Sequence, residues 1–146
     1  GAVARVFNAR GLPVTTNDLD SQRAATWHED ALQPGFYSAM RARLGRLDAL
    51  VFSSWFTFLD LALPLAASAA DVVACAHVPG HWLTDAPPPR QAWLRSLQSA
   101  GRLAIVTGLP RGPMGRRCLW VCVFKTAQLR KRMLRAAPPV PYVVFM

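Results

Sequence analysis

The chain has 146 residues, of which 52% are apolar and 17% are charged, so it has room for one domain with a sizeable core and does not have the composition of a disordered chain. Its three cysteines are too few for a disulfide-built secreted module, which favours an intracellular protein of unknown compartment. No signal peptide is visible, and because the sequence starts without Met we expect a fragment or a processed chain.

The net charge of +9 is unevenly placed along the chain. Residues 1–85 hold all eight acids and six arginines, whereas residues 86–146 hold eleven basic residues and no acid. A segment with this imbalance favours a polyanionic partner, above all DNA or RNA. Two alternatives stay open: the codon bias of a GC-rich genome, since 15 of the 17 basic residues are Arg, and membrane phosphate.

The first half of the chain alternates short helical and extended patterns. Apolar spacing predicts helices over residues 1–10, 36–45 and 57–70, the last of which tolerates Pro64. Short β-branched or apolar runs predict strands over 12–16, 25–28 and 47–52.

The second half continues this alternation. We expect helices over 87–100 and 126–135, and strands over 71–78, 103–107 and 119–124. Strands that alternate with helices predict an α/β fold: a three-layer, Rossmann-like, mostly parallel sheet with one antiparallel strand near the C-terminus. We expect one domain over residues 1–135, followed by a Pro-rich tail over 136–146.

Residues 49–78 are apolar enough to raise the question of a membrane span. Asp60, Pro64 and Asp71 interrupt them, and no uncharged run reaches about 18 residues. A central Asp costs roughly 3 kcal/mol in a bilayer. Strand, helix and strand in a buried core is therefore the better interpretation, and we expect no membrane partner.

In an open α/β sheet, ligands bind at the carboxyl ends of the strands. Acids follow the first two predicted strands, and hydroxyl and aromatic side chains follow the third. A carboxylate at such a position suits a ribose diol, and an aromatic ring suits stacking on a base. The residues concerned are Asp18, Asp20, Asp30, Ser53, Trp55 and Phe56.

These segments resemble the Rossmann-fold S-adenosylmethionine (SAM)-dependent methyltransferases, and most of all the DNA adenine-N6 methyltransferases. The resemblance covers roughly residues 1–125. It is carried by GAVARVFNARGLPVTTNDLD, by EDAL, by LDALVFSSWF with its apolar helix, and by GRLAIVTGLP and CLWVCVF. The implied function is SAM-dependent methyl transfer to a base amine in nucleic acid, with adenine N6 as the first choice.

The resemblance also implies roles for individual residues. Asp18 or Asp20 would hold the ribose of SAM, Asp30 would accept from its adenine amino group, and Leu32 would lie against the ring. Gly1 would be the remainder of the glycine-rich cofactor loop. Phe56, with Trp55, would stack on the target base, and Ser53 stands where the family has Asp or Asn.

Two departures from the family pattern support a rival hypothesis. The tetrad of residues 53–56 has no proline, and only Gly1 remains of the glycine loop. The rival is a catalytically degenerate module that binds RNA or DNA within a larger assembly. A methyltransferase that acts on a protein or a small molecule is a third possibility, against which the basic half argues.

Arginine suits phosphate because its planar fork can bind two oxygens. The candidate phosphate contacts lie in the Gly/Pro/Arg loop and in the basic helix, and the alternative is a solvated face. They are Arg111, Arg116, Arg117, Arg130, Lys131 and Arg132.

Cysteine and histidine show some metal-like spacing. Because Cys75, Cys118 and Cys122 lie inside apolar strands, we expect small buried side chains and no metal. His77 and His81 are interpreted as structural or pocket-lining residues.

Overall fold

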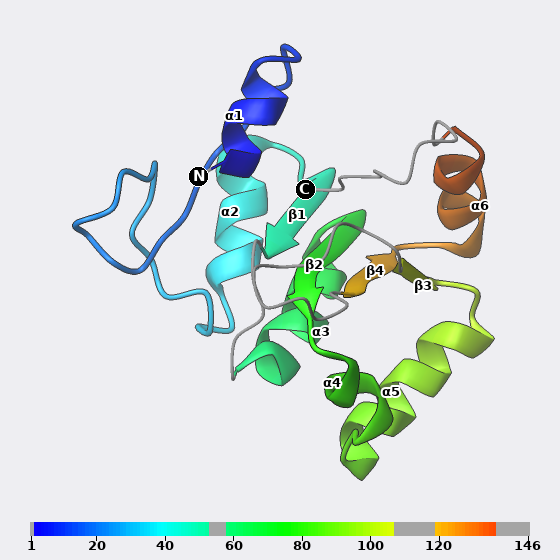
Figure 1. Cartoon of the computed structure of the whole chain (residues 1–146). Coiled ribbons are helices and arrows are strands. Elements are labelled where there is room, and N and C mark those ends of the chain that lie inside the picture. The colour runs from blue at the N-terminus through cyan, green and yellow to red at the C-terminus, as the bar shows by residue number, and fades with distance from the viewer. Residues whose placement is uncertain (1, 53–57, 107–118, 137–146) are drawn as a thin grey trace.

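The computed structural model describes residues 2–52, 58–106 and 119–136 (Figure 1). Its centre is a four-stranded sheet in the order β1-β2-β4-β3. β1 pairs parallel with β2, whereas β4 is antiparallel to both β2 and β3. The strands are β1 (Ala49–Phe52), β2 (Val72–Val78), β3 (Leu103–Val106) and β4 (Leu119–Phe124).

This topology corrects the predicted fold class, since the mostly parallel, three-layer Rossmann-like sheet is wrong. Only one of the three neighbouring pairs is parallel, and it is the pair that helix α3 (Leu59–Ala69) connects. A parallel pair needs such a crossover, whereas antiparallel strands do not. β4, near the C-terminus, runs opposite to the other three strands, as predicted, but it inserts between β2 and β3, so two of the three neighbouring pairs are antiparallel.

The predicted strands over residues 12–16 and 25–28 are also wrong. The only pairing in this region of the described structure is an isolated parallel bridge between Asn17 and Trp27, which lies outside the sheet. β-branched residues favour an extended backbone, but a strand forms only where a partner offers hydrogen bonds. The sheet therefore lacks the two strands that were expected to carry the acids.

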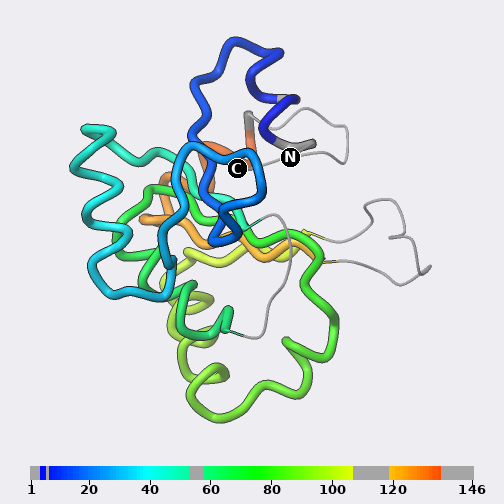
Figure 2. The backbone as a smooth tube through the Cα atoms, turned by 90° about the vertical axis from the view of Figure 1, so that its left-hand side faces the viewer, coloured from blue at the N-terminus to red at the C-terminus, as the bar shows by residue number. Residues whose placement is uncertain are grey.

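One face of the sheet packs against most of the helices. Val73 and Cys75 on β2 point to this face, and so do Val121 and Val123 on β4. Their neighbours in each strand point to the opposite face, because side chains alternate along a strand. The covering helices are α2 (Phe36–Leu44), α3, α4 (Gly80–Thr84) and α5 (Pro88–Ser99). Figure 2 shows α5 on one side of the strands and the N-terminal segment on the other.

The opposite face carries helix α6 (Ala127–Ala136). Leu129 and Met133, four residues apart, pack on a cluster that includes Ala74, Cys122 and Phe124. Full burial of an apolar side chain of this size contributes roughly 1.5–3 kcal/mol and partial burial contributes less, and these two residues decide which side of α6 faces the sheet.

The predicted helices and the four later strands are confirmed, with ends that differ by a few residues. Helix α1 (Ala2–Asn8) precedes Gly11. Gly45 and Gly101 adopt left-handed backbone conformations (φ 74° and 67°) directly after or close to the ends of α2 and α5, as glycine allows. The short helix α4 was not predicted, since its five residues are too few for a periodic signal.

Asp60 lies within the apolar stretch because it forms an ion pair there. Arg90 donates two hydrogen bonds to its carboxylate, at 2.7 and 2.6 Å, and a third to the Trp82 carbonyl at 2.8 Å. The guanidinium also lies 4.8 Å from the Trp82 ring centroid. Arg90 thereby joins α3, α4 and α5.

Among the described residues, none of the helices combines the length and apolarity that crossing a bilayer requires.

Candidate functional site

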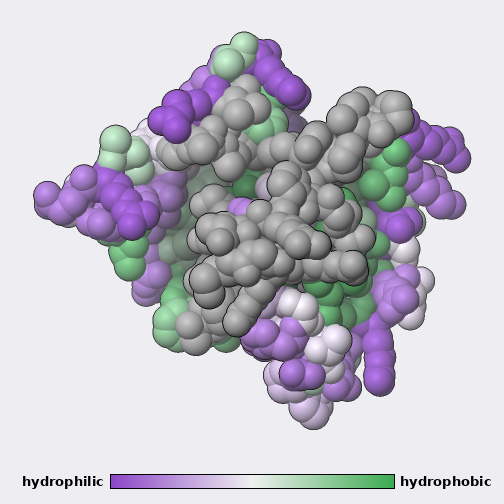
Figure 3. All heavy atoms as spheres, in the orientation of Figure 1, coloured by the Kyte–Doolittle hydropathy of each residue, from purple (hydrophilic) through white to green (hydrophobic). Residues whose placement is uncertain are grey.

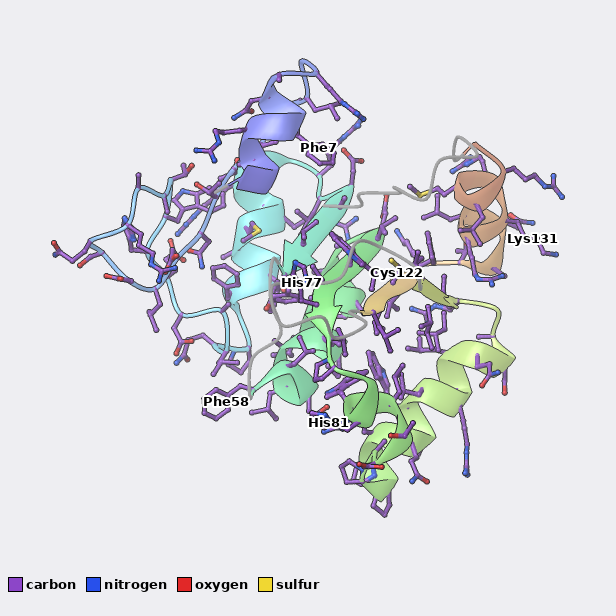
Figure 4. The ribbon with its side chains drawn as sticks, in the orientation of Figure 1. Phe7, Phe58, His77, His81, Cys122 and Lys131 are labelled. Atoms are coloured by element: carbon purple, nitrogen blue, oxygen red, sulfur yellow. The ribbon has the colours of Figure 1, made fainter. Side chains whose placement is uncertain are left out.

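The outer face of α6 carries a row of long polar side chains. Gln128, Lys131, Arg132 and Arg135 follow the spacing i, i+3, i+4, i+7, which places them on one side of a helix. All four are exposed, and together they line an open hollow of about 600 Å³. Figure 4 shows Lys131 on the side of α6 that is turned away from the sheet, and Figure 3 shows hydrophilic atoms in the same region. We call these four residues the basic row.

The three cations of the basic row have no acidic partner within the described part of the chain. Six of the eight acids instead form ion pairs with other basic residues, and none of these pairs includes a residue of α6. Because exposed cations without partners attract anions, the basic row is the clearest candidate site for an anionic ligand. The ion pairs are Arg23 with Asp18 and Asp20, Arg43 with Glu29, Arg46 with Asp48, Arg90 with Asp60, and Lys125 with Asp71.

Two contacts hold α6 in this position. The Thr126 hydroxyl accepts a hydrogen bond from the backbone N–H of Leu129 at 3.1 Å, which is the normal cap of a helix N-terminus. The Nε of Arg130 donates to the Leu103 carbonyl at 2.8 Å and ties the helix to β3. Arg130 was predicted to contact phosphate, and in the structure this half-buried side chain also connects two elements.

Sequence reasoning singled out Lys131 and Arg132 of the row and missed Gln128 and Arg135. It followed the contiguous run Arg130 to Arg132, whereas the helix groups residues three and four apart. Arg135 lies four residues after Lys131, so helical spacing would have identified it from the sequence alone.

A second hollow, of about 400 Å³, lies along β3 beside α6. We call it the β3–α6 groove. Its apolar side chains include Ile105 and Leu134, which are 43% and 37% exposed. The groove is lined by Gln98, Gly101, Leu103, Ala104, Ile105, Val106, Arg130 and Leu134.

The acids predicted to hold SAM cap turns of their own loop. Oδ1 of Asp18 accepts a hydrogen bond from the backbone N–H of Asp20 at 3.0 Å, and Oδ1 of Asp20 accepts one from the backbone N–H of Gln22 at 2.9 Å. Asp30 accepts the N–H of Leu32 at 2.9 Å. Such contacts are the ordinary use of Asp in turns.

Asp18 and Asp30 belong to one folded loop outside the sheet. Asn17 closes this loop, because its side-chain amide donates to the Glu29 carbonyl at 2.9 Å and accepts the Glu29 N–H at 3.1 Å. His28 adds a contact of its ring nitrogen with the Asp18 carbonyl at 2.8 Å. The carboxylates therefore do not follow strands of the sheet, which is where the predicted SAM site placed them.

Several predicted site residues lie outside the described residues and stay predictions. They are Gly1, Ser53, Trp55, Phe56, Arg111, Arg116 and Arg117.

His77 has a backbone conformation that the sequence did not predict. Its φ is +58°, and it lies in a bulge: Cys75 pairs with Val121, but Val78 pairs with Leu119, so β2 carries one extra residue. The exposed His77 ring lies 6.4 Å from the Trp120 ring centroid (Figure 4). Bulges and left-handed non-glycine residues are enriched beside functional sites. His77 is therefore a candidate ligand contact at the carboxyl end of β2.

The cysteines offer no second site in the described part of the chain. Cys75 and Cys122 face opposite sides of the sheet, and burial raises the pKa of each thiol to about 12. No group of three His, Cys, Asp or Glu side chains among the described residues is arranged to hold a metal ion.

Comparison with family models, with curated proteins and with solved structures finds no significant match for this chain.

Proposed function

We propose that this chain is a nucleic-acid-binding α/β module that contacts phosphates through the outer face of α6. The observation that carries this proposal is the basic row itself: three exposed cations and one amide around a hollow, without an acid partner in the described residues. This is the alternative function from the sequence, a binding module without a requirement for catalysis.

The dimensions of the basic row suit a phosphate backbone. Its seven-residue span covers roughly 10 Å of helix axis, at about 1.5 Å per residue. A nucleic-acid strand offers one negative charge about every 3.4 Å along the duplex axis, so the row can face two or three phosphates. Arg132 and Arg135 supply planar forks for phosphate oxygens, and Lys131 supplies a point charge.

The remaining charge of the molecule supports the same partner. The acids lie in the first 85 residues, and many of them are neutralised by nearby arginines. Helix α6 belongs to the half of the sequence that holds eleven basic residues and no acid, which favours a polyanionic partner.

Salt-dependent binding tests this proposal. We would titrate a labelled oligonucleotide with the chain at ionic strengths from about 50 to about 200 mM. We expect Lys131→Gln/Arg132→Gln/Arg135→Gln to lower the slope of log affinity against log salt by about two to three, because each lost phosphate contact removes about 0.9 on a duplex and about 0.7 on a single strand. The matched control, Arg5→Gln/Arg10→Gln/Arg95→Gln, removes the same charge from other elements and should change the slope much less.

Equal losses in the two triple variants would reduce the effect to net charge and contradict a defined site on α6. Affinity that ignores ionic strength would contradict the polyanion partner altogether. Anionic lipid vesicles form a further arm of the experiment: if they bind more tightly than the oligonucleotide and bind through the same three residues, the partner is a membrane surface and the proposal is wrong.

A further inference from the structure

We infer that the α6 surface takes single-stranded nucleic acid, whose bases lie in the β3–α6 groove while the phosphates contact the basic row. This inference rests on the proposed function and adds the form of nucleic acid that the surface binds.

Three elements shape the groove. β3 forms its floor, and Arg130 holds α6 beside that strand through the bond from its Nε to the Leu103 carbonyl. At one end of the groove, the segment after α5 comes close to the start of α6. A Cβ added to Gly101 would lie only 3.1 Å from the Cβ of Ala127. Gly101 thus permits a close approach that a larger residue would disturb.

The groove and the basic row share one helix. Leu134 lies three residues after Lys131, so helical geometry makes the apolar groove wall a neighbour of that cation. A strand whose phosphates contact the row has its bases on one side of the backbone. The groove is an apolar surface within reach of those bases.

The apolar character of the groove favours a single strand over a duplex. In a duplex, the base faces are stacked inside and the surface is phosphate, sugar and polar base edge. Ile105 and Leu134, both substantially exposed, would gain little apolar contact there, since the thymine methyl group is the main apolar group of the major groove. A single strand has free base faces that can cover such side chains, and it leaves the base edges open to hydrogen bonds. The Gln98 amide at the groove can both donate and accept.

The test compares a single strand with a duplex of the same sequence, measured by fluorescence anisotropy with the whole chain. For Ile105→Thr/Leu134→Gln we expect the affinity for the single strand to fall about tenfold and the affinity for the duplex to stay the same. Threonine keeps the β-branched shape that an edge strand favours. The control Leu19→Gln/Leu61→Gln changes two other exposed leucines (67% and 61%) and should affect neither affinity.

A thermal melt of each variant shows whether it folds, and Gln98→Ala, on the exposed face of α5, provides a second and milder variant. We expect this variant also to weaken binding of the single strand alone. Duplex binding as tight as single-strand binding, or an equal loss for both forms in the groove variants, would overturn this inference while the proposed function stands. Absence of salt-dependent binding for both forms would overturn the proposed function itself.

Discussion

At the residue scale, the buried thiols show how position decides chemistry. Cys75 and Cys122 come from neighbouring strands but face opposite sides of the sheet, where each packs as a small apolar side chain. Burial disfavours the charged thiolate, which is why both pKa values rise from 9.0 to about 12. At neutral pH both thiols are therefore protonated and poor nucleophiles.

These pKa shifts predict a loss of stability at alkaline pH. The unfolded thiols ionise near pH 9 and the folded ones near pH 12, so between these values the unfolded chain binds fewer protons. The free energy of unfolding should then fall with rising pH, by up to about 1.4 kcal/mol per pH unit for each thiol, and the contribution is fully present below pH 9.

Urea unfolding at a series of pH values measures this loss. Cys75→Ala/Cys122→Ala should show a shallower decline than the unchanged chain, and the same decline in both proteins would contradict the assignment. Tyr37 adds a smaller contribution to both, since burial and the nearby Asp30 carboxylate raise its pKa from 10.0 to about 12.

At the element scale, helix α3 runs through a proline. Pro64 is the sixth residue of Leu59–Ala69, where its missing N–H leaves the Asp60 carbonyl without its usual helical partner. The proline ring is exposed, so it contributes little packing in return. The helix forms because its other side buries Leu59, Ala62, Leu63, Ala66 and Ala69 in the core.

Replacing this proline should stabilise the protein. For Pro64→Ala we expect the free energy of unfolding to rise by about 1–3 kcal/mol, because alanine restores the hydrogen bond and is the better helix former. Pro88→Ala is the matched control, since Pro88 occupies the first position of α5, where no N–H is needed. Urea denaturation measures the free energy of unfolding of both variants. An equal change in the two variants, or a lower free energy of unfolding for Pro64→Ala, would contradict this explanation.

At the scale of the whole molecule, the acids lie apart from the basic row. Most of the acids lie in the N-terminal loop and around α3, where arginines accompany them, and the basic row stands on α6 beside the β3–α6 groove. This separation supports a binding surface, whereas no described cleft gathers the residues that the methyltransferase resemblance implies.

Methyl transfer nevertheless makes a definite prediction, because it requires that the chain bind SAM. Under that hypothesis, calorimetric titration with SAM releases or takes up heat, and Asp18→Asn/Asp30→Asn removes the signal. Asp48→Asn, an exposed acid that pairs with Arg46, is the control and should bind SAM normally. A chain that binds oligonucleotides but gives no heat with SAM would contradict methyl transfer and leave the nucleic-acid proposal unaffected.

The sequence by itself determined most of the helices and the four strands of the sheet, together with the basic character of α6. These features are local: apolar periodicity, glycine after a helix and charge composition act over a few residues. Leu119–Phe124 is apolar throughout and Val72–Val78 is apolar except for the exposed His77, and this pattern indicated burial.

The tertiary structure alone decided strand order, pairing and the surroundings of each polar group. Residues 12–16 form no strand of the sheet, and the acids that follow them cap turns of their own loop. The bulge at His77 and the contact between Arg130 and β3 likewise depend on which segments become neighbours. Such pairing is a competition between distant parts of the chain for the same hydrogen bonds, and a local pattern does not record its outcome.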